Sequence, residues 1–257
     1  MKKAFNSFKI AFKTYSKLPV GKIDYTAENM KYTMLFFPLV GLVLGGIFFG
    51  IFSLLTYFQV NFVFKSVILT LVPILVTGGF HFDGYIDTID ALSSYQSKER
   101  KLEILKDSHV GAFGVIFAIV FLLGYFGALT QIENVKSYVV LSICFVASRS
   151  LSGLSVTNFK SAREGSLRMV KDANDRKINN IFLVAYLILA ILAIICIDWK
   201  LALVVFSCFA FAFIRYKVKA YKNFGGITGD LAGYFLQTAE LIVVFGIAIF
   251  EAVIKCI

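Results

Sequence analysis

Three aspartates stand at helical spacing directly after one of the apolar blocks of this sequence. Asp83, Asp87 and Asp90 are spaced i, i+4 and i+7, so a helix places their carboxylates on one face. Like charges at this spacing repel each other and destabilise a helix. A divalent cation removes that penalty, and carboxylate oxygens favour Mg²⁺, Mn²⁺ or Ca²⁺ over zinc. The alternative interpretation is a solvated helix end that holds no ligand.

Two histidines lie near these carboxylates in the sequence. His81 adjoins the acidic cluster, and His109 comes too late in the chain to form an HExxH zinc site with it. Each histidine is a candidate proton carrier or phosphate ligand. Asp107 stands just before a further apolar block, where it can cap a helix or take part in a site.

Basic side chains follow the acidic cluster at several positions. Lys106 and Arg163 lie in polar segments, whereas Arg149 lies inside an apolar block. A charge in such a block must be paired or hydrated, so Arg149 either contacts substrate or forms an ion pair with Glu240. The stretch Gly225–Asp230 is not a P-loop; its glycines either let the backbone approach a ligand or form a turn. Metal-binding carboxylates beside basic groups are typical of phosphoryl or nucleotidyl-phosphate transfer.

Long apolar blocks must position these groups. Hydrophobic residues make up 58% of the 257 residues and charged residues only 16%, which does not fit an ordinary soluble domain. A span needs roughly 20 apolar residues, and backbone groups in lipid must be satisfied internally, so the blocks are helices. We therefore predict an all-α, polytopic transmembrane bundle, one membrane domain over 1–257, with seven spans at 34–58, 62–80, 110–130, 137–157, 179–197, 201–214 and 231–254.

The distribution of positive charge predicts how the bundle is oriented. Of the 26 Lys and Arg residues, 21 fall in the segments 1–31, 81–109, 158–178 and 215–230. The positive-inside rule assigns these segments, with the N terminus and the active site, to the cytoplasmic face of the cell (inner) membrane. Segment 1–31 is predicted to be an amphipathic helix on the anionic inner leaflet. The net charge of +10 therefore requires no nucleic-acid partner.

The polar motifs, taken in order, resemble the cobalamin synthase (adenosylcobinamide-GDP ribazoletransferase) family. The stretch TGGFHFDGYIDTIDAL is similar to the signature of that family, and KERKLEILKDSHVGAFGV is similar to its next block. SKLPV, FFPLVGLVLG, SAREG and GGITGD also match in family order. Together these motifs cover most of the chain.

The resemblance implies an activity and a set of roles. A membrane-embedded, Mg²⁺-dependent enzyme joins α-ribazole or its 5′-phosphate to adenosylcobinamide-GDP and releases GMP, the last nucleotide-loop step of vitamin B12 synthesis. Asp83, Asp87 and Asp90 match the carboxylates that hold metal, and one of them or His81 accepts the hydroxyl proton. The expected partners are these two substrates and the lipid bilayer, with other cobalamin-assembly enzymes or a second copy left open.

Other matched positions extend the expected site. Lys106 and Arg163 match blocks that bind phosphate, and Asp107 and Asp230 bind metal or order a loop. The chain departs from the family at Ala91, where the family has Gly, and at His109, where it has Arg. The change at His109 weakens a phosphate contact, because histidine is mostly neutral at pH 7.

Two other classes of membrane protein are alternatives to this family. A CDP-alcohol phosphotransferase has DG-x-x-AR, whereas here the acidic motif continues with Asp87 and Thr88. A transporter places polar groups and broken helices near the bilayer midplane, whereas the carboxylates here gather at one face.

Overall fold

The computed structural model describes residues 2–256, which form α-helices and no strand. Most helix ends follow local signals: Asn61, Asn134 and Asp198, for example, each accept backbone N–H bonds at the start of a helix. The helices are α1 (Lys2–Tyr15), α2 (Ala27–Met30), α3 (Thr33–Tyr57), α4 (Phe62–Thr77), α5 (Phe80–Ser93), α6 (Lys98–Ile104), α7 (Ala112–Leu129), α8 (Val135–Asn158), α9 (Ser166–Ala173), α10 (Arg176–Ile197), α11 (Trp199–Phe224) and α12 (Gly229–Lys255).

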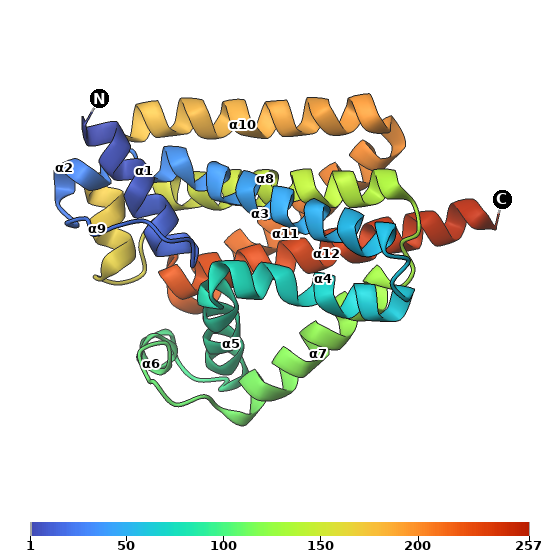
Figure 1. Ribbon diagram of the computed structural model, residues 1–257. Helices are drawn as coiled ribbons and strands as arrows, with labels where there is room; N and C mark the ends of the chain where they lie inside the picture. Colours follow the sequence, from blue (N-terminus) through green and yellow to red (C-terminus); the bar gives the residue numbers. More distant parts are fainter. Residues whose placement is uncertain (1, 257) are drawn as a thin grey trace.

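The long helices form one bundle. The helices α3, α4, α8, α10, α11 and α12 run roughly alongside one another, and α7 leans across them (Figure 1). Six helices are long and apolar enough to cross a membrane, and α4 with α5 makes a seventh candidate, bent by 95°. The predicted all-helical membrane bundle with about seven spans is therefore confirmed.

The most buried of the spanning helices is α8. It packs against α3, α10 and α12, and 72% of its most apolar window is buried. By contrast, only 17% of the corresponding window of α10 is buried, and side chains such as Ile188 and Leu189 point outwards. An apolar helix with an apolar outer surface is what hydrocarbon surroundings permit. The core of the bundle thus lies around α8, and α10 forms its edge.

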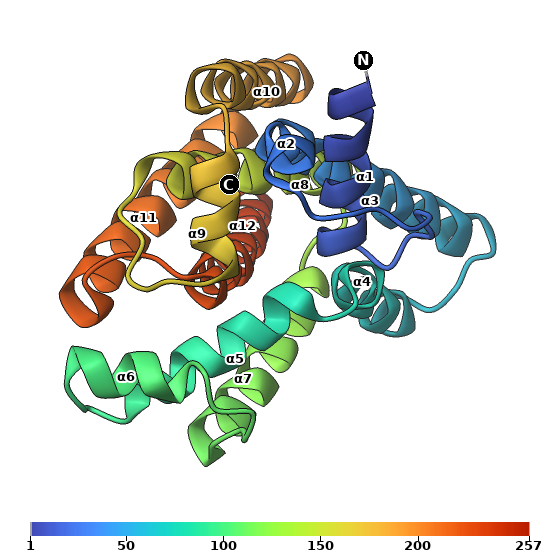
Figure 2. The same cartoon turned by 90° about the vertical axis from the view of Figure 1, so that its left-hand side faces the viewer.

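The polar parts of the chain share one end of the bundle. The N terminus, α1, α2 and α9 lie at the end opposite to the C terminus (Figure 1), and the view onto this end also shows α5 and α6 (Figure 2). The four basic segments predicted to lie on one side of the membrane therefore do meet at one end of the molecule.

Helix α11 is longer than the predicted sixth span. We expected the span to end at residue 214, but the helix continues to Phe224 and ends at Gly225, whose φ is +75°. Arginine and lysine are good helix formers, so the basic residues beyond residue 214 do not interrupt the helix. Arg215 stacks on the Phe211 ring, and Lys219 bonds the Tyr234 hydroxyl at 2.8 Å.

The N-terminal amphipathic helix is present as α1, but its apolar face does not lie on the bilayer alone. Ile10 and Phe12 are buried, and Phe12 clusters with Phe37 of α3 and Leu236 of α12. The bundle therefore covers part of this face, whereas Phe5 remains exposed. The helix predicted from the spacing is confirmed, and its place on the inner leaflet stays a prediction.

Candidate active site

Two glycines turn the chain from α4 into α5. Gly78 and Gly79 have φ values of +67° and +78°, in the left-handed region that glycine enters without steric cost. The resulting bend of 95° takes α5 out of the direction of the spanning helix α4. Helix α5 therefore runs across the bundle near the end that carries α1 and α9 (Figure 1).

The acidic face predicted from the spacing of three aspartates is formed by α5. Asp83 is exposed, and Asp87, one turn later, is half-buried. Burial, followed by repulsion from Asp83, Asp230 and Asp90, raises the pKa of Asp87 to about 7. The charge of these carboxylates is thus only partly offset by the chain itself.

A fourth carboxylate reaches this face from the other end of the sequence. Gly84 packs directly on the backbone at the start of α12, where a Cβ atom would lie only 2.8 Å from the Cα atom of Asp230. The missing side chain at Gly84 therefore allows α12 to approach α5 closely. Asp230 accepts hydrogen bonds from Arg163 at 3.0 Å and from Thr228 at 3.2 Å.

Arg163 is held in place by two loops. The Ile227 N–H donates to the Lys160 carbonyl at 2.8 Å, and the Ala162 N–H donates to the Ile227 carbonyl at 2.9 Å, so the loops before α9 and α12 are joined. The guanidinium of Arg163 also donates to the Leu102 carbonyl of α6 at 3.1 Å. Three segments far apart in the sequence thereby meet beside the acidic face.

Lys106 and Arg163 line a common cavity of about 250 Å³, which we call the Lys106 cavity. Its wall also includes Glu164 and Asp230. The structure therefore brings together five of the predicted residues. Lys106 and Arg163 line the cavity with Asp230, and Asp230 lies beside Asp83 and Asp87 where α12 packs on Gly84. This arrangement can hold a phosphate group next to carboxylates.

Asp90 has a role that its spacing did not indicate. Its two carboxylate oxygens accept the backbone N–H groups of Gly111 at 2.7 Å and Gly114 at 2.8 Å. These N–H groups belong to the first turn of α7 and have no partner within that helix. Asp90 thus caps α7 and fixes it to α5, whereas Asp83 is exposed.

The remaining predicted residues lie away from the acidic face. His81 is 3% exposed, and its ring lies beside the rings of Tyr15 and Phe37. Asp107 bonds to His109 at 2.7 Å on an exposed loop, and two hydrogen bonds from His109 lower the pKa of the Asp107 carboxyl. The structure therefore does not bring His81, Asp107 or His109 together with Asp83 and Asp230.

Arg149 is fully buried and forms an ion pair with Glu240 of α12. The Ser148 hydroxyl donates to the same carboxylate at 2.8 Å. Of the two interpretations that the sequence allowed for Arg149, the structure thus shows the ion pair inside the bundle. Arg149 lines neither cavity beside the acidic face.

A second polar cavity, whose wall includes Asp83, was not predicted from the sequence. It has a volume of about 510 Å³, and Lys13, Lys17, Gly78, Gly79 and Asp83 are among the residues that line it; we call it the Lys17 cavity. Both lysines fall in segment 1–31, which was predicted to be amphipathic, and neither was named as a site residue. A signal was present, because Lys17 belongs to the SKLPV stretch.

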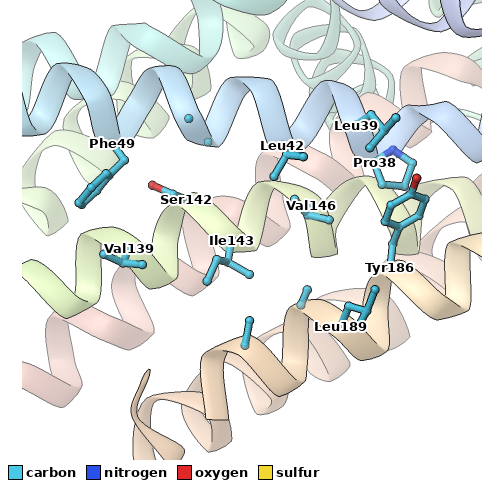
Figure 3. Close-up of a pocket in the computed structure, with 14 residues that line it drawn as sticks. Pro38, Leu39, Leu42, Phe49, Val139, Ser142, Ile143, Val146, Tyr186 and Leu189 are labelled. Carbon is cyan, nitrogen blue, oxygen red and sulfur yellow. The ribbon is translucent and has the colours of Figure 1, made fainter. Parts of the chain in front are cut away.

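A third cavity is apolar and lies far from these charges. It has a volume of about 420 Å³ and opens between α3, α8 and α10, where Phe49, Ile143 and Leu189 line it (Figure 3). Such a groove between spanning helices offers no group for phosphoryl chemistry. The polar chemistry is therefore confined to the end of the bundle.

The donors at the acidic face fit a hard divalent cation in kind. Within residues 2–256, no three His, Cys, Asp or Glu side chains lie close enough to enclose a metal ion as they stand. Asp83 and Asp87 nevertheless form no ion pair among the described residues, and only Asp230 is offset by Arg163. Oxygen donors with excess negative charge are what Mg²⁺ binds.

Comparison with known proteins identifies the family of this chain. The chain matches the cobalamin-5-phosphate synthase family over residues 7–248. An adenosylcobinamide-GDP ribazoletransferase of Lachnoclostridium phytofermentans is 44% identical over 98% of this chain and 97% of that protein. Proteins of the same name from Desulfitobacterium hafniense and Vibrio cholerae are 32% and 29% identical, over 92% of this chain and 94% and 90% of their own lengths. No solved structure matches the chain significantly. This chain belongs to the cobalamin-5-phosphate synthase family.

Proposed function

We propose that this chain is an Mg²⁺-dependent adenosylcobinamide-GDP ribazoletransferase. It joins α-ribazole or its 5′-phosphate to adenosylcobinamide-GDP and releases GMP. Family membership favours this activity over a CDP-alcohol phosphotransferase or a transporter. The observation that carries the proposal is the meeting of Asp83 and Asp87 with Asp230, Arg163 and Lys106, which come from four separate segments.

The reaction requires one proton acceptor and offset negative charge. The ribazole 3′-hydroxyl forms a P–O bond at the phosphorus attached to cobinamide, and the bond to the GMP oxygen breaks with its electron pair. We assign the hydroxyl proton to Asp87, because this carboxylate lies beside Asp83 and Asp230 and forms no ion pair with a described residue, so it is free to act as a general base. Arg163 and Lys106 bind diphosphate oxygens, and their charge stabilises the leaving group.

The metal would be held by the carboxylates on either side of Gly84. Asp83 and Asp230 supply oxygen donors there, with Asp87 beside them. When bound, Mg²⁺ supplies charge that offsets the diphosphate and the carboxylates. Asp90 and Asp107 are left out of this set, because the first caps α7 and the second bonds to His109.

The direct test is GMP release by the purified protein in detergent. The substrates are adenosylcobinamide-GDP and α-ribazole 5′-phosphate, with Mg²⁺ or with EDTA. We expect one GMP for each cobalamin 5′-phosphate formed, and no release in EDTA. Release that persists in EDTA argues against the metal, and no release from folded protein with Mg²⁺ argues against the activity.

We propose that the site lies on the cytoplasmic face of the cell (inner) membrane. This assignment rests on the basic segments that meet at the end of the bundle beside α1 and α9. Cys256 is exposed at the opposite end, so a membrane-impermeant maleimide added to intact spheroplasts should label it. Labelling of Cys256 only after lysis would reverse the orientation.

A further inference from the structure

The Lys17 cavity has a charge that the chain leaves unbalanced. Lys13 and Lys17 form no ion pair with any residue of 2–256, and Asp83 is the only carboxylate in the wall. In the Lys106 cavity, by contrast, Lys106 and Arg163 are matched by two acidic residues. An anion that binds without an accompanying cation is therefore attracted more strongly to the Lys17 cavity than to the Lys106 cavity.

The wall of this cavity is fixed by backbone contacts. The Lys17 N–H donates to the Val76 carbonyl at 2.9 Å, which ties the end of α1 to the end of α4. The aliphatic part of Lys17 lies over Gly78, where a Cβ atom would come within 2.3 Å of the Lys17 Cε atom. Glycine at this turn thus makes room for the lysine that lines the cavity.

The start of α5 adds to the positive character of the same wall. Gly78, Gly79 and Phe80 line the cavity, and no side chain caps the N-terminal end of α5 at Gly79. The free N–H groups of a first helical turn favour an anion, as lysines do. Two lysines and these N–H groups suit the three oxygens of a phosphate monoester.

The two cavities meet at the acidic face. Asp83 lines the Lys17 cavity, Asp230 lines the Lys106 cavity, and Gly84 packs against Asp230 one residue after Asp83. In phosphoryl transfer the attacking and leaving oxygens are roughly in line, on opposite sides of phosphorus. Two cavities that reach neighbouring carboxylates therefore suit one nucleophilic substrate and one leaving group.

We propose that the Lys17 cavity is the binding site for the 5′-phosphate of the nucleoside substrate, α-ribazole 5′-phosphate. The diphosphate of adenosylcobinamide-GDP, which can bring Mg²⁺, lies at the Lys106 cavity. The assignment rests on the proposed function. It makes the N-terminal helix α1 a part of the substrate site.

The test compares phosphorylated and unphosphorylated nucleoside in the full-length protein. In Lys17→Gln and Lys13→Gln we expect KM for α-ribazole 5′-phosphate to rise about 10-fold or more, as for the loss of a hydrogen bond to a charged group. KM for α-ribazole and for adenosylcobinamide-GDP should stay unchanged. Lys17→Arg should keep most of the affinity, and Lys22→Gln, which alters an exposed lysine outside both cavities, should have no effect.

Other outcomes overturn the assignment. A rise in KM for adenosylcobinamide-GDP would place the diphosphate in the Lys17 cavity, and an equal rise for both nucleosides would exclude a phosphate contact. An effect of Lys17→Gln that is seen only in nanodiscs with phosphatidylglycerol, and not with phosphatidylcholine alone, would identify a lipid phosphate instead. If the wild-type protein shows no turnover, the proposed function fails. The phosphate subsite is then tested separately, by equilibrium dialysis of α-ribazole 5′-phosphate. Equal affinity of the wild type and Lys17→Gln for this nucleotide overturns the subsite.

Discussion

Charged side chains gather in two regions of this molecule, and only one region is balanced. Inside the bundle, Arg149 of α8 pairs with Glu240 of α12, and both are fully buried. On the face of α5, Asp83 and Asp87 approach Asp230, and among residues 2–256 Arg163 is the only cation paired with this group. A buried charge in a membrane protein must be matched within the chain. Unmatched carboxylates at an accessible end are instead available for a cation or a proton from outside.

The largest expected effect is the loss of activity on neutralising the unbalanced region. Asp83→Asn should lower the rate of GMP release about 10³-fold or more, because a donor for the metal is lost. The Tm should not fall, since Asp83 is exposed and makes no ion pair with described residues. Asp24→Asn, which alters an exposed aspartate that lines neither cavity, serves as the control. Near-normal turnover in folded Asp83→Asn would remove the distinction between the two regions.

The balanced region should respond in stability. Glu240→Gln leaves Arg149 buried without its counter-ion, and breaking a buried pair costs about 3–5 kcal/mol. The free energy of unfolding, measured by denaturant titration in detergent, should fall by that amount. The double variant Arg149→Met with Glu240→Gln should recover part of it. Full stability with lost GMP release in Glu240→Gln would show that the pair belongs to the active site.

Arg163 joins the unbalanced region to the Lys106 cavity. Arg163→Gln removes a cation from the expected diphosphate site and frees Asp230. We expect KM for adenosylcobinamide-GDP to rise about 10-fold to 100-fold, the loss typical of a hydrogen bond to a charged group. Arg100→Gln is the matched control, because Arg100 is exposed and pairs only with Glu103. An equal effect of both variants would indicate general surface charge.

The smallest effect concerns pH and the metal-free protein. Since the pKa of Asp87 is raised from 3.8 to about 7 in the folded protein, its proton stabilises the fold at low pH, and this stabilisation is lost as pH rises through about 7. In EDTA, the Tm of the wild type relative to Asp87→Asn should therefore fall between pH 5 and pH 8. Added Mg²⁺ should restore it at pH 8. A difference in Tm that does not change with pH would contradict the raised pKa.

The sequence was sufficient for the elements that follow from local periodicity. The seven helices and the acidic face of α5 lie where apolar length and i, i+4, i+7 spacing place them. The extension of α11 to Phe224 was underestimated, because hydropathy stops at Arg215 whereas the helix stops only at Gly225. Basic residues end an apolar block, but they do not end the helix.

The tertiary parts of the site could not be predicted from local pattern. Lys13 and Lys17 lie near Asp83 because the chain after α1 bonds to the end of α4, and the contact of Gly84 with Asp230 depends on how α12 packs. The capping of α7 by Asp90 joins residues more than twenty positions apart. Spacing placed three carboxylates on one face, but packing decides which of them remains open.

The most direct test of the contrast between the two regions is to measure Mn²⁺ binding by electron paramagnetic resonance in the absence of substrate. The wild-type protein and Glu240→Gln should bind Mn²⁺, in competition with Mg²⁺, whereas Asp83→Asn and Asp230→Asn should bind it at least about 10-fold more weakly. Equal binding by wild type and Asp83→Asn, or loss of binding in folded Glu240→Gln alone, would contradict the assignment of the metal to the unbalanced carboxylates.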